Sequence, residues 1–312
     1  MLYRQVEPCP ERDGRPARKH AADLICWAGV GISMGRTTVI GRTGPRSARC
    51  AGRNPAHAAL AAGLLVALAA VTSALADDIE AFLAGTVKSC VECDLSGRDL
   101  KDREFKRVKL DRANLKKADL TQATLFRSSF QHADLSGAKL VDADLNRIDA
   151  KWADFQGADL TGALLFEADL SSANLAGATL LNARLGQALL NQANLEGARL
   201  AGADLRGARL AGAKLAGAKL RSAKLDGQKL REMDLRGVDF TLSDMVEADL
   251  YGADLRSAIF AGVDLFGANL HGADLRGTSF EGANLKNAIL TDAQTEGANF
   301  DAAIMPDGKR QE

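Results

Sequence analysis

The clearest candidates for chemistry in this chain are two cysteines, Cys90 and Cys93, spaced as Cys-x-x-Cys. Such a pair can form a structural disulfide, act as a redox-active dithiol, or supply two ligands to a zinc ion. A redox pair normally lies near the start of a helix in a βαβ unit, and a structural zinc site needs four ligands. We therefore predict that Cys90 and Cys93 form a structural disulfide.

The other residue types that catalyse reactions are scattered or repeated. His132 and His271 lie far apart in the sequence. Glycine recurs at regular intervals instead of forming a phosphate-binding loop between a strand and a helix. Asp is abundant, but it belongs to a repeated pattern, which indicates a structural role. The sequence thus predicts no catalytic residue, no metal site and no cofactor, and we do not expect an enzyme.

Charged side chains alternate in blocks, although the formal net charge is zero. Residues 196–231 contain nine Lys or Arg and three Asp or Glu, whereas residues 232–281 contain three and ten. The chain is not strongly basic, so we expect no nucleic-acid binding. Two interpretations of the blocks stay open: local salt bridges that keep the protein soluble, or bands that dock a protein partner or a second copy. The candidate partner-binding residues recur at every fifth position: Lys214, Lys219, Lys224 and Lys229.

The four lysines belong to a five-residue repeat, so the fold that this repeat builds determines where they lie. Every position divisible by five from 95 to 300 is Leu or Phe, except Ala150, Met245 and Thr295, and Ala dominates two positions earlier. Neither the 3.6-residue period of a helix nor the two-residue period of a long strand keeps both positions on one side. A three-residue strand does, and the two remaining residues, often Gly or Ser, can turn a corner. Stacked coils about 4.8 Å apart would then enclose Ala, Leu and Phe.

These units, for example Ala-Asp-Leu-Ser-Gly at 133–137, resemble the A(D/N)LXX pattern of the pentapeptide-repeat family. The resemblance extends from Cys93 to Met305 without a change of register. It implies an all-β fold, the right-handed quadrilateral parallel β-helix, a solenoid with four repeats in each coil. On this fold the four lysines would encircle one coil as a basic ring.

Two departures from the pattern bear on packing. Ile148 and Ala150 exchange the usual small and large residues, which nearly conserves the interior volume. Arg98 and Arg103 occupy positions that would otherwise face inward, where an unpaired charge is very costly. We therefore expect the first coil to be irregular or open to solvent.

The first 76 residues are not expected to belong to this fold. Five arginines and no acidic residue occupy 36–53, an uncharged apolar stretch follows, and Ala74-Leu75-Ala76 has the small-x-small form of a cleavage site. This pattern predicts a secretory signal peptide. The alternative is a retained membrane anchor, because the stretch is just long enough to span a bilayer.

An open β-helix needs a cap at each end. The stretch 77–85 offers acidic residues that can begin a helix, one apolar face and a terminal glycine, so we predict a short N-terminal capping helix. The predicted divisions are 1–52 as a disordered leader or a start assigned too far upstream, 53–76 as the apolar region of the signal peptide or anchor, 77–92 as capping helix and linker, 93–305 as repeats, and 306–312 as a C-terminal tail.

These features predict an exported, non-enzymatic scaffold or protein-binding rod, periplasmic or secreted, with self-association as a further expectation. One alternative is a DNA-mimic, topoisomerase-binding protein, since some pentapeptide-repeat proteins inhibit a topoisomerase. The basic ring and the signal segment oppose it, because a DNA mimic is cytoplasmic and strongly acidic. The other alternative is an envelope protein anchored in the inner membrane, if segment 54–76 is not cleaved.

Overall fold

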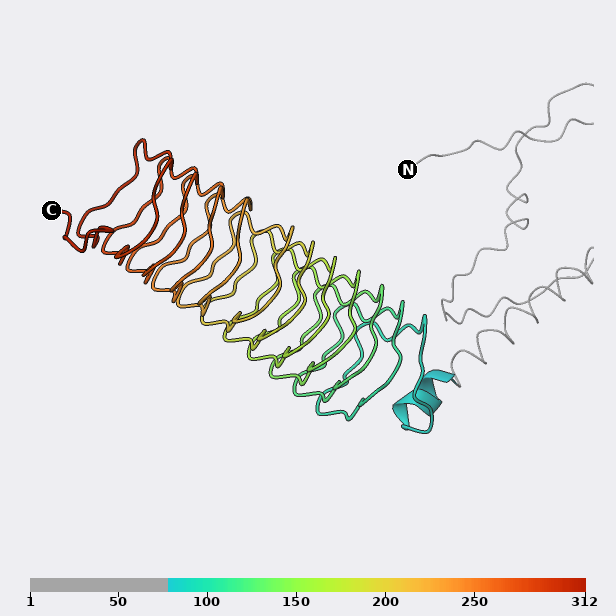
Figure 1. The fold of residues 1–312 in the computed structure, drawn as a ribbon. Helices are drawn as coiled ribbons and strands as arrows, with labels where there is room; N and C mark the ends of the chain where they lie inside the picture. Colours follow the sequence, from blue (N-terminus) through green and yellow to red (C-terminus); the bar gives the residue numbers. More distant parts are fainter. Residues whose placement is uncertain (1–77) are drawn as a thin grey trace, which may run out of the picture. The chain divides into compact units, whose positions relative to one another are not determined.

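The computed structural model describes residues 78–312. The predicted leader and signal segment, residues 1–76, lie outside the described residues. A helix spans 78–83, and from residue 89 the chain forms a β-helix built from isolated bridges instead of long strands (Figure 1). Among the helical residues of 78–312, no segment is long and apolar enough to cross a bilayer.

Parallel bridges join the central residue of each short strand to the residue twenty positions later, as in Asp134↔Asp154. Twenty residues therefore make one coil, and its four five-residue units form four faces. The N–H of Leu115 donates to the Asp134 carbonyl at 2.7 Å, and the N–H of Asp134 donates to the Ala113 carbonyl at 3.0 Å. This pattern recurs from coil to coil and confirms the quadrilateral β-helix that the family resemblance implies.

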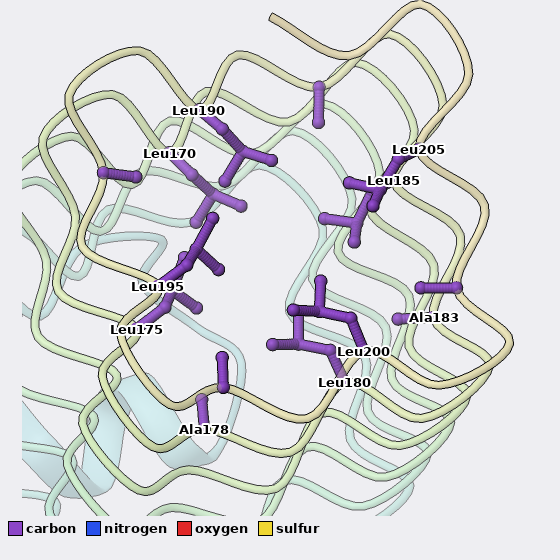
Figure 2. Packing of buried hydrophobic residues seen from close by; sticks show 14 of the residues in the cluster. Leu170, Leu175, Ala178, Leu180, Ala183, Leu185, Leu190, Leu195, Leu200 and Leu205 are labelled. Atoms are coloured by element: carbon purple, nitrogen blue, oxygen red, sulfur yellow. The ribbon is translucent and has the colours of Figure 1, made fainter. Parts of the chain in front are cut away.

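The interior contains the small and large apolar side chains of the repeat. Leu and Ala side chains from successive faces point inward, among them Leu170, Leu190 and Ala178, which are buried (Figure 2). Ile148 and Ala150, the inverted pair, are both buried as well. The predicted core register is therefore confirmed.

Polar residues at the strand centres hold the corners. Asp134 Oδ1 accepts a hydrogen bond from the Ser136 N–H at 3.1 Å, and the same i to i+2 bond recurs in many units. It explains why Asp and Asn dominate this position, which sequence reasoning had related only to solvent exposure. The second corner residue takes a positive φ even when it is large, as in Trp152 (φ 56°). Gly162 (φ 69°) has a further reason, because a Cβ there would overlap Asp142 Oδ1.

The expectation that the first coil is irregular or open to solvent is corrected for its backbone and confirmed at Arg98, whose side chain at an inward-register position is exposed. The backbone of this coil forms the same bridges as later coils, beginning with Ser89, four residues before the predicted boundary at 93. Arg98 is exposed, whereas Arg103 is half-buried and donates a hydrogen bond to the Leu83 carbonyl. The Arg103 guanidinium lies 5.7 Å from the ring centroid of Phe105. Both arginines thus avoid an unpaired position inside the coil, so the backbone stays regular.

The C-terminal segment returns toward the last coil. The Met305 N–H donates to the Lys309 carbonyl at 2.7 Å, and the Gln311 N–H donates to the Ala303 carbonyl at 2.8 Å. An antiparallel bridge also joins Ile304 to Arg310. The segment predicted as a tail, 306–312, therefore lies largely in this return.

Candidate functional site

The four candidate lysines occupy the strand centres of consecutive units, one on each face of a single coil. The centres of the strands face outward because the flanking residues of each strand face the core. All four side chains are exposed. The ring predicted by the resemblance, Lys214, Lys219, Lys224 and Lys229, is hereafter called the lysine ring.

Aspartates of the next coil lie directly beside three of these lysines. Parallel bridges connect Lys219 to Asp239, Lys224 to Asp244 and Lys229 to Asp249. Despite this proximity, none of the four lysines forms an ion pair with another residue of 78–312. The ring is therefore a set of four exposed ammonium groups, one on each face of the coil, without an ion pair among the described residues.

Two of the three neighbouring aspartates, Asp239 and Asp249, pair with other residues. Asp239 accepts hydrogen bonds from the Thr241 N–H at 3.1 Å and pairs with Arg221 at 3.2 Å. Asp249 accepts from the Tyr251 N–H at 3.3 Å and pairs with Arg231 at 3.4 Å. Arginines at the corners thus take the carboxylates, which leaves the lysines of the adjacent coil available to another molecule.

Cations nearer the N-terminus behave differently. Lys116 Nζ lies 3.0 Å from Asp134 Oδ2 of the next coil, and the hydrogen bond that the ammonium donates to this carboxylate raises the pKa of Lys116. Lys151 likewise lies 3.0 Å from Asp169, and this pair raises the pKa of Lys151. Lys116 and Lys151 therefore form salt bridges between coils, whereas the lysines of the ring form none among the described residues.

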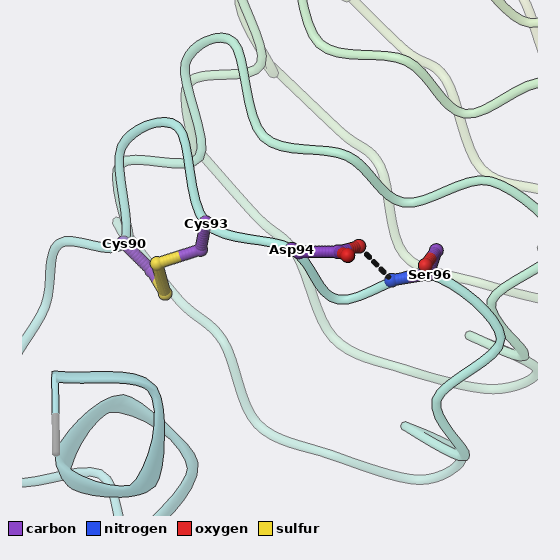
Figure 3. Close-up of a disulfide and its surroundings, with 4 residues drawn as sticks. All are labelled: Cys90, Cys93, Asp94 and Ser96. Atoms are coloured by element: carbon purple, nitrogen blue, oxygen red, sulfur yellow. Dashed lines mark hydrogen bonds between the residues drawn. A yellow bond between two sulfur atoms is a disulfide. The ribbon is translucent and has the colours of Figure 1, made fainter. Parts of the chain in front are cut away.

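The two cysteines are joined by a disulfide at the start of the β-helix (Figure 3). Their Cα atoms are 5.4 Å apart, and the side chains of Cys90 and Cys93 are only 2% and 6% exposed. Asp94, the next residue, accepts a hydrogen bond from the Ser96 N–H at 3.1 Å. This burial suits a structural bond better than a dithiol that must meet a substrate.

The two histidines are not brought together, and within residues 78–312 each stacks on an aromatic side chain. His132 stacks on Trp152 with ring centroids 5.0 Å apart. His271 stacks on Tyr251, and its Nδ1 lies 2.6 Å from Thr291 Oγ1. Over the described range 78–312, no group of three or more His, Cys, Asp or Glu side chains could hold a metal ion.

Sequence reasoning did not anticipate a hollow on one corner of the solenoid. Phe126 and Phe166 line a cavity of about 450 Å³ together with Arg147 and Arg184. The Phe166 N–H donates to Asn146 Oδ1 at 2.9 Å. The five-residue period places both phenylalanines on one corner, but it does not show that the intervening coil leaves space between them.

The family of the chain follows from this repeat. Eight copies of the family model for pentapeptide repeats match, over residues 89–126, 128–165, 153–192, 168–207, 188–227, 229–262, 243–282 and 268–306. The chain belongs to the pentapeptide-repeat family.

Solved structures of similar proteins include HetL, a pentapeptide repeat protein involved in heterocyst differentiation regulation from the cyanobacterium Nostoc sp. strain PCC 7120. It is 28% identical, with a TM-score of 0.41 over 75% of this chain and 97% of its own. A pentapeptide repeat protein of the Arabidopsis thaliana thylakoid lumen is 28% identical. The match has a TM-score of 0.27 and covers 40% of this chain and 66% of that protein. Full-length QnrB1, a plasmid-mediated fluoroquinolone resistance protein, is 21% identical, with a TM-score of 0.21 over 67% and 92%. No curated protein matches the chain.

Proposed function

We propose that the β-helix is a non-enzymatic scaffold that docks an acidic protein partner on the lysine ring. The observation that supports this most directly is the set of four ammonium groups around one coil, unpaired among the described residues. Complementary charge steers association and fixes the orientation of the partner. Backbone bridges join Lys219 and Lys224 to both neighbouring coils, so these two charges are presented on a regular framework.

We propose in addition that the protein is exported to the periplasm or secreted. The apolar segment 53–76, which lies outside the described residues, has the composition of a signal peptide. The Cys90–Cys93 disulfide is the state expected in an oxidising compartment. Fractionation with N-terminal sequencing tests this: we expect a mature chain that begins after Ala76. A cytosolic chain that begins earlier would contradict export, and a membrane-bound chain that keeps 54–76 would favour the anchored alternative.

Helix 78–83 is proposed to cap the N-terminal opening. Phe82 is 1% exposed, and its ring stacks on Phe105 with centroids 5.1 Å apart. A cap of this kind shields the first coil and blocks pairing of its free edge with another chain.

Charge reversal tests the docking proposal. Wild-type protein, a ring variant (K214E, K219E, K224E, K229E) and a control variant (K88E, K109E, K117E, K286E) would be compared in quantitative capture from the exported fraction. The control lysines are also exposed and lack an ion pair within 78–312. Both variants replace four lysines by glutamate, so the change in net charge is the same. We expect the ring variant alone to lose an acidic protein. Equal losses in both variants would show that only net charge matters.

The DNA-mimic alternative has a separate test. A DNA mimic must present acidic groups, and the unpaired lysine ring opposes that role. Inhibition of a topoisomerase by the purified protein would overturn the scaffold proposal in favour of this alternative.

A further inference from the structure

The ladder of bridges is interrupted at one place, beside the lysine ring. Between residues 89 and 304, the repeat leads us to expect Arg209↔Lys229 and Lys214↔Asp234, and both are absent. The two other faces of the same layer keep their bridges, as in Asp204↔Lys224. Figure 1 shows the coils further apart here, along the upper edge of the yellow segment. The coil around 207–216 and the coil around 227–234 are thus separated on two adjacent faces, and we call this space the inter-coil cleft.

Backbone hydrogen bonds are missing on the same two faces. In other coils each of these N–H groups donates to a carbonyl of a neighbouring coil, as the Leu205 N–H does to Lys224 at 3.0 Å. The ladder resumes at the margin of the cleft, where the Gly217 N–H donates to the Arg236 carbonyl at 3.0 Å. Within the described chain, the N–H groups here that lack their expected acceptor in a neighbouring coil belong to Gly207, Leu210, Gly212, Leu215, Lys229 and Asp234.

Two large side chains account for the separation. Gln228 and Met233 occupy inward positions where Ala is usual, on the two faces that separate. Gln228 Nε2 donates to the Ala208 carbonyl at 2.7 Å, an acceptor that the Lys229 N–H would otherwise use. Val263 occupies the same type of position without disturbing the bridges of its coil. The length of the two side chains, and not merely their departure from Ala, is therefore what distinguishes the cleft.

The cleft is accessible from outside. One cavity of about 440 Å³ includes Ala208 and Leu210 in its lining, and a second of about 530 Å³ includes Ala213 and Leu215. Ala208 and Ala213 are 7% and 6% exposed, whereas the equivalent Ala198 is fully buried. The unpaired backbone groups can therefore meet another molecule.

We propose that the inter-coil cleft binds a short extended peptide segment with acidic side chains, which pairs with the free backbone groups. This inference rests on the proposed function, because it specifies how an acidic partner engages the ring. An extended peptide presents alternating N–H and C=O groups, which is how strands are added to the edge of a sheet.

The charges around the cleft select the chemistry of the peptide. Arg209 and Lys229 line the first cavity, which has no acidic residue in its lining. The second cavity is lined by side chains of both charges. Lys214 and Arg231 are basic, and Glu196, Glu232 and Asp234 are acidic. Acidic side chains of the bound segment are therefore expected over the first cavity.

Hydrogen exchange and peptide binding test the inference on the full chain. The probe is a fluorescent synthetic peptide of alternating Glu and Val, and the control is the same peptide with N-methylated backbone nitrogens. In the free protein, we expect amides at Leu210 and Leu215 to exchange faster than those at Leu190 and Leu195, and to slow when the probe binds. The N-methylated peptide keeps its charge but loses its donors, so we expect at least about tenfold weaker binding. Slow exchange in the free protein, or equal binding of both peptides, would overturn the inference.

A variant that closes the cleft separates this inference from ring docking. Gln228→Ala with Met233→Ala restores the usual inward residue and leaves all four lysines in place, so we expect loss of probe binding with capture of the acidic partner reduced but not abolished. Val263→Ala is the matched control and should not alter probe binding. Unchanged probe binding in the double variant would contradict the cleft, whereas ring docking would stand. If the ring variant captured the partner as wild type does, the proposed function itself would fail.

Discussion

Gln228 donates a side-chain hydrogen bond to the Ala208 carbonyl of the preceding coil at 2.7 Å, where the repeat would otherwise use the backbone N–H of Lys229. The inward polar residue Ser243 fits without such an exchange. Ser243 Oγ donates to the Leu220 carbonyl at 2.7 Å, and its coil keeps a continuous ladder. A hydroxyl is short enough to remain inside the coil, whereas the longer carboxamide reaches between coils.

Replacing the two long side chains should stabilise the protein. Gln228→Ala with Met233→Ala should let the coils close and regain backbone hydrogen bonds, each worth roughly 0.5–1.5 kcal/mol. The closed coil would resemble its neighbours and leave no cavity. We expect the free energy of unfolding in urea to rise by at least about 1 kcal/mol.

The matched control for that experiment is Val263→Ala, and its free energy of unfolding should fall instead of rise. Val263→Ala removes buried methyl groups from an unbroken coil, at a cost of about 0.8 kcal/mol for each buried carbon. A double variant at 228 and 233 that lost stability as Val263→Ala does would contradict the idea that the two side chains hold the coils apart.

The inverted pair predicts a rescue experiment. Ala150→Leu alone would place two large residues in one unit, since Ile148 is already buried there, and should cost roughly 1–3 kcal/mol. Ile148→Ala added to it recreates the common Ala-x-Leu unit, and most of that loss should be recovered. Thermal unfolding of the single and double variants measures the coupling. Additive losses would show that interior volume is not shared within the unit.

A column of Asp–Arg pairs predicts loss of stability in acid. Asp234, Asp254 and Asp274 lie on one face of successive coils, and each accepts a hydrogen bond at 2.6 Å from the arginine two residues later. These bonds hold the pKa of each carboxyl below its ordinary value. The folded chain therefore binds fewer protons here than the unfolded chain, so stability is lost as the pH falls below about 4.

The measurement is the midpoint of thermal unfolding at pH 7 and pH 3. The D234N, D254N, D274N variant should show a smaller decrease between these two conditions than the wild type does. An identical decrease in both proteins would mean that other carboxylates determine acid unfolding.

The disulfide predicts a mass and a modest stability effect. The tryptic peptide 89–98 from protein kept without reductant should be lighter by two hydrogens than the reduced peptide. Cys90→Ser with Cys93→Ser should lower the free energy of unfolding by at most about 2 kcal/mol, because the bond closes a very short loop. Free thiols in both residues of the purified exported protein would contradict the assignment.

Much of the fold could be predicted because the repeat is simple. A five-residue period with Ala and Leu fixes which side chains face inward, and even the exchange of Ile148 and Ala150 could be understood as conserving volume. The regular backbone of the first coil was not predicted, because Arg103 donates a hydrogen bond to the Leu83 carbonyl of the N-terminal helix, a contact outside its own unit. Contacts between an end helix and the first coil are not encoded in the period.

The candidate site was predicted only in part. The family resemblance placed the four lysines on one coil, but their lack of ion pairs is seen only in the structure, where corner arginines such as Arg221 pair with two of the adjacent aspartates. The cleft was missed, although Gln228 and Met233 are two successive departures from Ala and are visible in the sequence. Periodicity defines register, whereas the spacing between coils depends on side-chain length.

Site-specific photo-crosslinking tests the central claim most directly, because it reports where on the solenoid a partner sits. A photoreactive residue would replace Lys219 in one protein and the equally exposed Lys109 in a control, with crosslinking in the native compartment followed by mass spectrometry. The lysine ring predicts a crosslinked acidic protein from position 219 and not from position 109. An equal yield from both positions, or a partner captured only from position 109, would contradict docking on the ring.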